Sequence, residues 1–149
     1  MESILGDNRK ASLPDHDVFG TPENKVFYAS NPYSRLDVNR KEIRLLKIHP
    51  DDGTGSIKCT LLPSIPLDQA RSLYTALSYC AGDSTRTDII VVNGIGFNAF
   101  ANLRHALGGV REFWDKTYKH ADKDLLLWTD QICIDQMDLQ ERSHQVGFM

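Results

Sequence analysis

Side chains that could do chemistry gather near the C-terminus, after an apolar run at residues 125–128 that has the composition of a buried strand. Asp130 follows this run by two positions. In open α/β sheets, ligands bind beyond the carboxyl ends of the strands. Asp130 could therefore orient a ribose hydroxyl or act as a base. It could equally bond loop amides and hold the turn.

A second pair of acids marks the start of a helix. Asp138 and Glu141 have the spacing of an acid-led capping box, in which each side chain accepts a hydrogen bond from the backbone N–H of the other. The neighbouring Arg142 could bind a phosphate through two parallel hydrogen bonds. It could also pair with Asp138 or Asp135 at the surface, and the sequence leaves both interpretations open.

Cys133 and His144 are of the types that form a nucleophile and its base. Cys133 lies between two isoleucines, which favours a buried cysteine that packs as a small apolar residue. The five histidines show no metal-ligand spacing, so we expect no metal site.

Two amides lie in the same C-terminal segment. Gln131 and Gln136 are interpreted as partners of backbone groups in an irregular loop, and a ligand role for Gln131 stays open. The candidate ligand-binding residues are therefore Arg142, Gln131 and Asp135.

The composition sets limits on the class of protein. The 149 residues suit one domain, with 41% hydrophobic and 25% charged residues. The net charge of −3 gives no electrostatic argument for binding nucleic acid or an anionic membrane. No apolar run approaches the roughly 20 residues that span a bilayer, and the N-terminus does not have the pattern of a secretory signal. Three widely spaced cysteines favour a reducing compartment, so we expect a cytoplasmic protein. No cofactor of its own is expected.

Alternating apolar residues predict a first hairpin. Residues 43–48 fit a strand that ends at Pro50, and Ile57, Cys59 and Leu61 would share one face of the returning strand. A short helix is expected within residues 67–73. Residues 74–81 predict a buried strand that breaks at Gly82.

A second hairpin is predicted at residues 87–98, because Asn93-Gly94 is a strong two-residue turn signal. Asn98 is expected to cap the helix that follows. That helix has one apolar stripe, formed by Phe100, Leu103, Leu107, Val110 and Trp114. Gly108-Gly109 interrupts the stripe and is expected to split or bend the helix.

These elements predict an α/β fold with a mixed sheet, flanking helices and an N-terminal β-hairpin. The strand at residues 125–128 is expected to be parallel to its neighbours and covered on both faces. Residues 1–32 are polar and interrupted by prolines, which indicates an arm or a loosely docked extension. The domain proper would then span residues 33–149.

Three blocks of sequence resemble a known family. The first contains Tyr74, Thr75, Ala76, Leu77, Ser78, Tyr79, Gly82 and Asp83. The second contains Phe97, Asn102, Leu103, Ala106 and Leu107. The third is the most specific and contains Leu127, Trp128, Thr129, Asp130, Gln131, Ile132, Cys133, Ile134, Asp135, Gln136, Asp138, Glu141, Arg142, Gln145 and Val146. Together these blocks resemble the heterokaryon-incompatibility (HET) domain of filamentous fungi.

The chain departs from this family at two points. The family usually carries a tryptophan where this chain has Ala81. HET domains also typically continue beyond the helix that contains Glu141. The resemblance therefore implies that residues 33–149 are the N-terminal portion of such a domain, truncated at its C-terminal end.

The resemblance implies an effector or signalling module in fungal non-self recognition and programmed cell death. Its partners would be other HET-domain or recognition proteins, and self-association is a further expectation. HET domains are thought to be distantly similar to Toll/interleukin-1 receptor (TIR) domains, which have a flavodoxin-like fold and in some cases cleave NAD with a glutamate. By that analogy Glu141, and secondly Asp130, would be catalytic and NAD the substrate. A further alternative is an inert or dominant-negative HET fragment.

Overall fold

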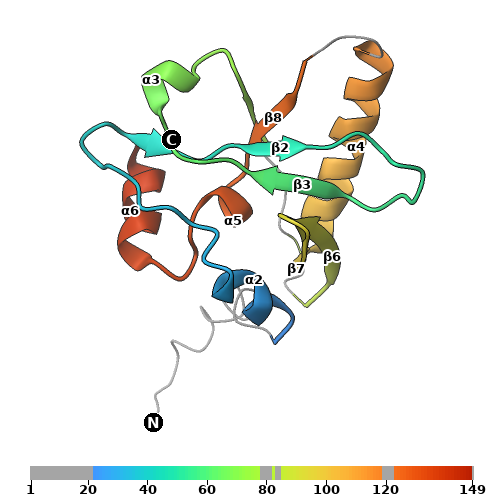
Figure 1. The fold of residues 1–149 in the computed structure, drawn as a ribbon, viewed down its shortest axis with the longest axis horizontal. Helices are drawn as coiled ribbons and strands as arrows, with labels where there is room; N and C mark the ends of the chain where they lie inside the picture. Colours follow the sequence, from blue (N-terminus) through green and yellow to red (C-terminus); the bar gives the residue numbers. More distant parts are fainter. Residues whose placement is uncertain (1–21, 78–81, 83–84, 119–122, 149) are drawn as a thin grey trace.

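The computed structural model describes residues 22–77, 82, 85–118 and 123–148, and the side chains up to residue 145. A six-stranded sheet runs through it in the order β5-β8-β2-β3-β6-β7, of which Figure 1 labels all strands but β5. A two-stranded sheet pairs β1 with β4. Within the larger sheet, β3–β6 and β5–β8 are parallel, and the other pairs are antiparallel. The predicted mixed sheet with flanking helices is confirmed.

The centre of the sheet is the predicted N-terminal hairpin. β2 (Leu46–Ile48) pairs with β3 (Lys58–Leu61) in antiparallel register, from Leu46 opposite Leu61 to Ile48 opposite Cys59. The side chains of Ile57, Cys59 and Leu61 are all buried, as their alternation predicts.

The segment before this hairpin forms a separate short strand. β1 (Glu42–Ile43) pairs with β4 (Ile65–Pro66) and not with β3. The predicted single strand is therefore broken between β1 and β2. Arg44 lies in this break, where the chain passes from one sheet to the other.

The second predicted hairpin is also confirmed. β6 (Thr87–Val92) and β7 (Ile95–Phe100) pair along their whole length. Asn93 and Gly94 join them with φ values of 55° and 79°. Two positive φ values are those of a type I′ turn, whose twist suits adjacent strands.

Asn98 does not cap a helix, contrary to the prediction. It lies inside β7, is buried, and its backbone exchanges two hydrogen bonds with the side chain of Asn24, at 2.6 and 3.2 Å. Asn24 ends the 3₁₀ helix η2 (Pro22–Asn24), and α2 (Lys25–Ala29) follows. Because β7 is the last strand of its sheet, the Asn24 amide satisfies backbone groups that would otherwise lie unpaired at an edge.

Part of the predicted N-terminal arm contributes to the core. The ring of Phe27 in α2 is fully buried and meets Phe97 edge to face, with 4.9 Å between ring centroids. Residues 1–21 of the predicted arm lie outside the described residues.

The predicted split of the long helix is wrong. α4 (Ala101–Thr117) continues through Gly108 and Gly109 and packs against β6 and β7. Each internal glycine costs about 1 kcal/mol relative to alanine. Burial of three side chains offsets that cost: Leu103, Leu107 and Arg111. Arg111 also donates to the carbonyl oxygen of Ser56 at 2.7 Å, which ties the helix to the loop before β3.

The C-terminal segment enters the sheet through β8, which pairs with the edge strand β5 on one side and with β2 on the other. β8 (Leu125–Trp128) is buried as predicted, and it is parallel to β5 but antiparallel to β2, so the expected all-parallel setting holds on one side only. β5 (Thr75–Ala76) is an exposed strand at the sheet edge, and the expectation of a buried strand is wrong there. Residues 78–81 of that prediction lie outside the described residues.

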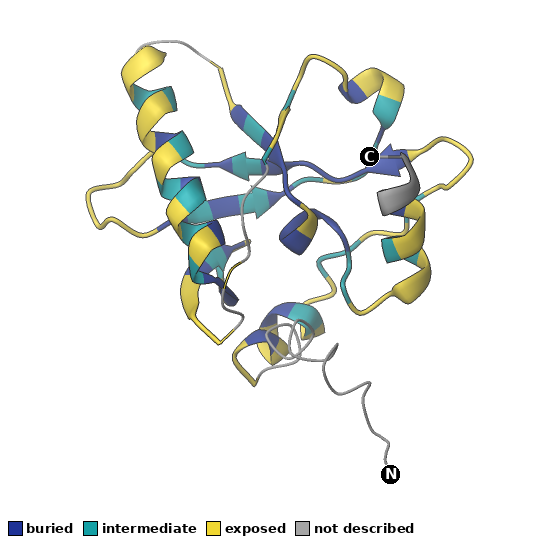
Figure 2. Ribbon diagram, turned by 180° about the vertical axis from the view of Figure 1, so that it is seen from behind, coloured by how far each residue is buried: buried dark blue, intermediate teal, exposed yellow. Residues whose placement is uncertain are grey.

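Three short helices complete the fold, and the predicted helix near residue 67 is among them. They are α3 (Leu67–Ala70), α5 (Asp130–Cys133) and α6 (Leu139–Phe148). Buried residues gather on the central strands and on the inner sides of the helices, and exposed residues lie on their outer turns (Figure 2). In the described part of the chain, no helix is long and apolar enough to cross a membrane.

Candidate functional site

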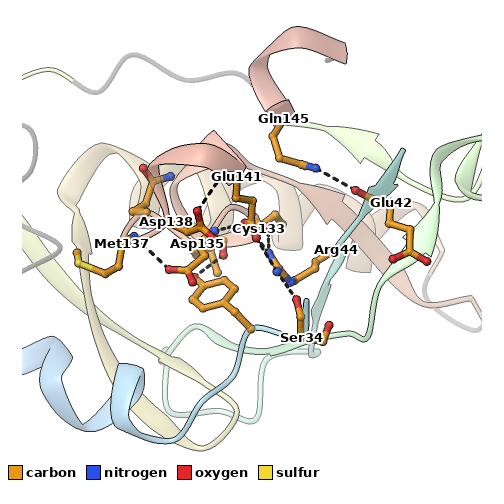
Figure 3. Close-up of polar contacts among 12 residues, drawn as sticks. Ser34, Glu42, Arg44, Cys133, Asp135, Met137, Asp138, Glu141 and Gln145 are labelled. Atoms are coloured by element: carbon orange, nitrogen blue, oxygen red, sulfur yellow. Dashed lines mark hydrogen bonds and ion pairs between the residues drawn. The ribbon is translucent and has the colours of Figure 1, made fainter. Parts of the chain in front are cut away.

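A buried arginine organises the C-terminal segment. Arg44 has 1% of its surface exposed, and its guanidinium donates to both carboxylate oxygens of Glu141, at 2.7 and 2.8 Å (Figure 3). It also donates to the carbonyl oxygens of Cys133, at 3.2 Å, and of Ser34. The planar guanidinium matches a carboxylate in this two-bond geometry, which is among the strongest side-chain pairings.

Helix capping places Glu141 in reach of Arg44. Asp138 precedes α6, and its Oδ1 accepts a hydrogen bond from the backbone N–H of Glu141 at 3.1 Å. This half of the predicted capping box is confirmed. The reciprocal half is wrong, because the Glu141 carboxylate accepts from Arg44 and from the backbone N–H of Asp135, at 2.5 Å.

A second bond joins the same helix to the same strand segment. The side-chain amide of Gln145 donates to the carbonyl oxygen of Glu42 at 2.9 Å (Figure 3). Glu141 and Gln145 lie one helical turn apart, about 6 Å along the axis. Glu42 and Arg44 lie two extended residues apart, about 6.6 Å. The two spacings match, so one face of α6 contacts two alternate positions of the chain, Glu42 and Arg44.

An aromatic residue covers the arginine. The ring centroid of Tyr33 lies 4.9 Å from the guanidinium carbon of Arg44, a cation–π distance. The Tyr33 hydroxyl donates to the carbonyl oxygen of Ile132 at 2.7 Å. Burial raises the pKa of this phenol well above its usual value, so Tyr33 stays protonated and keeps the bond.

These residues line a cleft of about 360 Å³ between the segment at residues 33–44 and α6. The lining is formed by Tyr33, Ser34, Arg35, Leu36, Val38, Glu42, Arg44, Asp135, Asp138, Gln140, Glu141, His144 and Gln145. Burial raises the pKa of the Asp135 carboxyl, and the charges of Glu141 and Asp138 raise it further, while the Met137 N–H and Arg44 lower it. The cleft is therefore a place where carboxylates lie near one another.

The other predicted acid lies elsewhere. Asp130 is the first residue of α5, is exposed, and lies beyond the carboxyl end of β8. Its carbonyl oxygen accepts from the Gln136 side chain at 2.6 Å. Gln131 is buried, and its Oε1 accepts from the backbone N–H of Phe100 at 3.4 Å. Both glutamines thus bond backbone groups, as the sequence indicates.

Cys133 is a core residue. Its side chain is fully buried, and its sulfur accepts from the Thr129 N–H at 3.5 Å. Burial raises the pKa of the thiol to about 12, which keeps it neutral at physiological pH. His144 is exposed on α6 at the cleft. The geometry favours the packing interpretation of Cys133 over the nucleophilic one.

The residues of the three sequence blocks occupy distinct places. Ala76 lies in the edge strand β5, Tyr74 and Leu77 flank it, and Gly82 has a φ of 65°. Ser78 and Tyr79 lie outside the described residues. The remaining members lie on α4 (Asn102, Leu103), β8 (Trp128), α5 and the residue after it (Asp130, Ile132, Cys133, Ile134), the loop that follows (Gln136, Asp138) and α6 (Glu141, Arg142, Gln145).

Arg142 is partly exposed on α6, so its predicted ligand-binding role stays a prediction. Over the described ranges, no group of three or more histidine, cysteine or acidic side chains is placed to hold a metal ion.

Sequence reasoning missed Arg44, Tyr33 and Glu42 as parts of this site. A signal was present, since Arg44 interrupts the apolar run Ile43, Leu45, Leu46. A charged residue in a buried strand needs a paired partner. The sequence alone did not point to Glu141, which lies 97 positions away.

Comparison with known protein families shows to which family this chain belongs. The sequence pattern described as "Heterokaryon incompatibility protein (HET)" matches residues 74–149, which is half of the chain. The chain belongs to the HET family. The match includes Glu141 and Gln145, whereas their partners Arg44 and Glu42 precede it.

A curated relative of this HET chain is "Heterokaryon incompatibility protein 6, OR allele" of Neurospora crassa. It is 40% identical over 113 residues, which cover 72% of this chain and 16% of the relative. The chain thus spans less than a fifth of that relative's length. No solved structure matches the chain, so the distant similarity to TIR and flavodoxin-like folds stays a prediction.

The pairing of Arg44 with Glu141 predicts a large loss of stability in Glu141→Gln. The substitution leaves the buried guanidinium without a counter-charge, which typically costs about 3–5 kcal/mol. Glu112→Gln is the matched control, because Glu112 pairs with Lys116 on an exposed face of α4 and such pairs contribute about 0.3–0.5 kcal/mol. Urea unfolding of both variants measures the difference. Equal midpoints for the two would contradict the structural role of Glu141.

The raised pKa of Asp135 predicts a pH-dependent gain in Asp135→Asn. In the parent chain the folded state holds the Asp135 proton more tightly, so the contribution of Asp135 to stability is greatest below the unfolded pKa of about 3.9 and is lost as pH rises through the folded pKa. Asparagine removes that loss and keeps the oxygen that accepts from the Met137 N–H at 3.1 Å. The variant is expected to be more stable than the parent at pH 7 and equal to it near pH 3. Thermal melts across this range test the expectation, and parallel pH curves would contradict it.

Proposed function

We propose that this chain forms part of an effector module in fungal non-self recognition that leads to programmed cell death. Membership of the HET family carries the proposal. The curated relative is named a heterokaryon incompatibility protein and comes from a filamentous fungus, which supports the same role.

The module would act through contacts with other proteins. Two exposed apolar side chains lie where the third block enters α6: Met137 is 52% exposed and Leu139 is 71% exposed. They adjoin Asp138, which lines the cleft. Apolar side chains beside polar ones are typical of contact surfaces. The partners would be other HET-domain or recognition proteins in the cytoplasm, with self-association as one form of assembly.

A chimera tests this function. The matching segment of the Neurospora crassa relative is replaced by the corresponding residues of this chain, and the chimera is expressed in strains of both compatibility types. We expect growth arrest and uptake of a vital dye in the incompatible strain only. Glu112→Gln in the chimera should retain the effect, and Glu141→Gln should lose it together with the fold. A stable, well-expressed chimera that never arrests growth would refute the proposal.

Cleavage of NAD is a second candidate with narrower support. One observation favours it: Asp130 is exposed beyond the carboxyl ends of the parallel strands β5 and β8, where α/β proteins bind ligands. A carboxylate there could stabilise the oxocarbenium-like state of glycosidic cleavage. Glu141 has less freedom for that role, because Arg44 and Asp135 already engage its carboxylate.

This second candidate predicts that the folded chain consumes NAD and that Asp130→Asn abolishes the turnover without changing the melting temperature. Nicotinamide release, followed by chromatography, measures it. Asp68→Asn on α3 is the control, since it removes a similar exposed carboxylate elsewhere. Absence of nicotinamide release by the folded parent chain would exclude NAD cleavage by residues 1–149.

A further inference from the structure

The lining of the cleft has an excess of negative charge. It contains four carboxylates, Glu42, Asp135, Asp138 and Glu141, against two arginines, which gives a formal charge of −2 with His144 neutral. Arg44 pairs with Glu141, and Arg40 pairs with Glu42 at 3.5 Å, so Asp135 and Asp138 carry the remaining negative charge of the lining. Burial is the main cause of the raised pKa of Asp135, and the charges of Glu141 and Asp138 raise it further. An anion such as a pyrophosphate would be repelled here, and a cation would be attracted.

The cleft also has an apolar wall. Leu36 and Val38 line it together with the acids, and Val38 is 48% exposed. An apolar wall beside carboxylates suits a long side chain with an aliphatic stem and a charged head. A bare metal ion does not need such a wall, and no metal-binding group of acids occurs among the described residues.

Two buried polar atoms on the same lining lack hydrogen-bond partners among the described residues. One is the carbonyl oxygen Oε1 of Gln145, a side chain that is 1% exposed and oriented by its bond to Glu42. The other is the Nε of Arg44, also 1% exposed. Unpaired buried groups are rare in folded proteins. A peptide group carries both a donor and an acceptor, so a polypeptide that displaces the side chains slightly could pair with both atoms, whereas a free amine could pair with the acceptor alone.

We propose that this cleft binds an arginine or lysine side chain presented by a partner polypeptide. The acids at Asp135 and Asp138 face the charged head, and Leu36 and Val38 pack on its stem. The volume of about 360 Å³ lies near the lower end of small-molecule pockets, about 300–1,000 Å³, and suits one side chain with a short piece of backbone. The inference names the chemistry of the partner and so rests on the proposed interaction role.

A matched pair of peptides tests it. The 149-residue chain, labelled with ¹⁵N, is titrated with acetyl-Gly-Gly-Arg-Gly-Gly-amide and with the same peptide carrying citrulline, which has the shape of arginine without its charge. We expect the arginine peptide to shift the side-chain amide resonances of Gln145 and the backbone amide of Asp135. The citrulline peptide should bind at least tenfold more weakly, a difference of about 1.4 kcal/mol.

A double variant supplies the matching change in the protein. Asp135→Asn with Asp138→Asn removes two charges, yet each asparagine keeps the oxygen that accepts from the backbone, at Met137 and Glu141 respectively. Asparagine is as good an N-cap as aspartate, so the fold is expected to persist. Affinity for the arginine peptide should fall at least tenfold. Asp68→Asn, outside the cleft, should leave it unchanged.

Three outcomes would overturn the inference. They are equal affinity for the two peptides, resonance shifts confined to residues outside the cleft, or full binding by a folded double variant. Peptide binding in a chain whose chimera causes no growth arrest would retain the inference and refute only the effector role. Growth arrest without peptide binding would retain the effector role and refute the inference.

Discussion

The buried guanidinium of Arg44 is the constraint on which the C-terminal half of this domain depends. Arginine does not lose its proton in a protein, so the folded chain must surround it with acceptors. Those acceptors come from three distant places: the segment before β1, the end of α5 and the first turn of α6. An unpaired buried charge is strongly destabilising. The three segments must therefore assemble together, and this requirement fixes where α6 lies against the segment at residues 42–44.

The geometry of regular structure makes that assembly specific. One turn of helix and two residues of extended chain have nearly the same length, so Glu141 and Gln145 meet Arg44 and the Glu42 carbonyl together. A slip of one residue at β1 would turn Arg44 to the opposite face of the chain. The same slip would leave the carboxylate of Glu141 without its guanidinium. Ion pairing thus specifies register here, in addition to any stability it contributes.

The features that could be predicted from sequence are those set by neighbours in the chain. Asn93-Gly94 determines its own turn, and Asp138 caps a helix that starts at the next residue. The errors arise where distant contacts override local preference. Asn98 has the local preference of a helix cap, but it lies in the edge strand β7, where its backbone N–H donates to the side chain of Asn24. Gly108-Gly109 would weaken an isolated helix, but burial against the sheet keeps α4 continuous. The pairing of Arg44 with Glu141 joins residues whose proximity only the complete fold determines.

The pairing of Arg44 with Glu141 also gives the acids of the C-terminal segment different roles. A carboxylate has about four positions for accepting hydrogen bonds, and three of those on Glu141 are taken by Arg44 and the Asp135 N–H. Little of Glu141 remains for a substrate, so its position in a cleft does not by itself indicate catalysis. Asp135 and Asp138 differ, because each gives one oxygen to the backbone and lines the cleft. Glu141 thus holds the site together, whereas Asp135 and Asp138 can contact a ligand in the cleft. This difference favours ligand recognition over bond cleavage at α6.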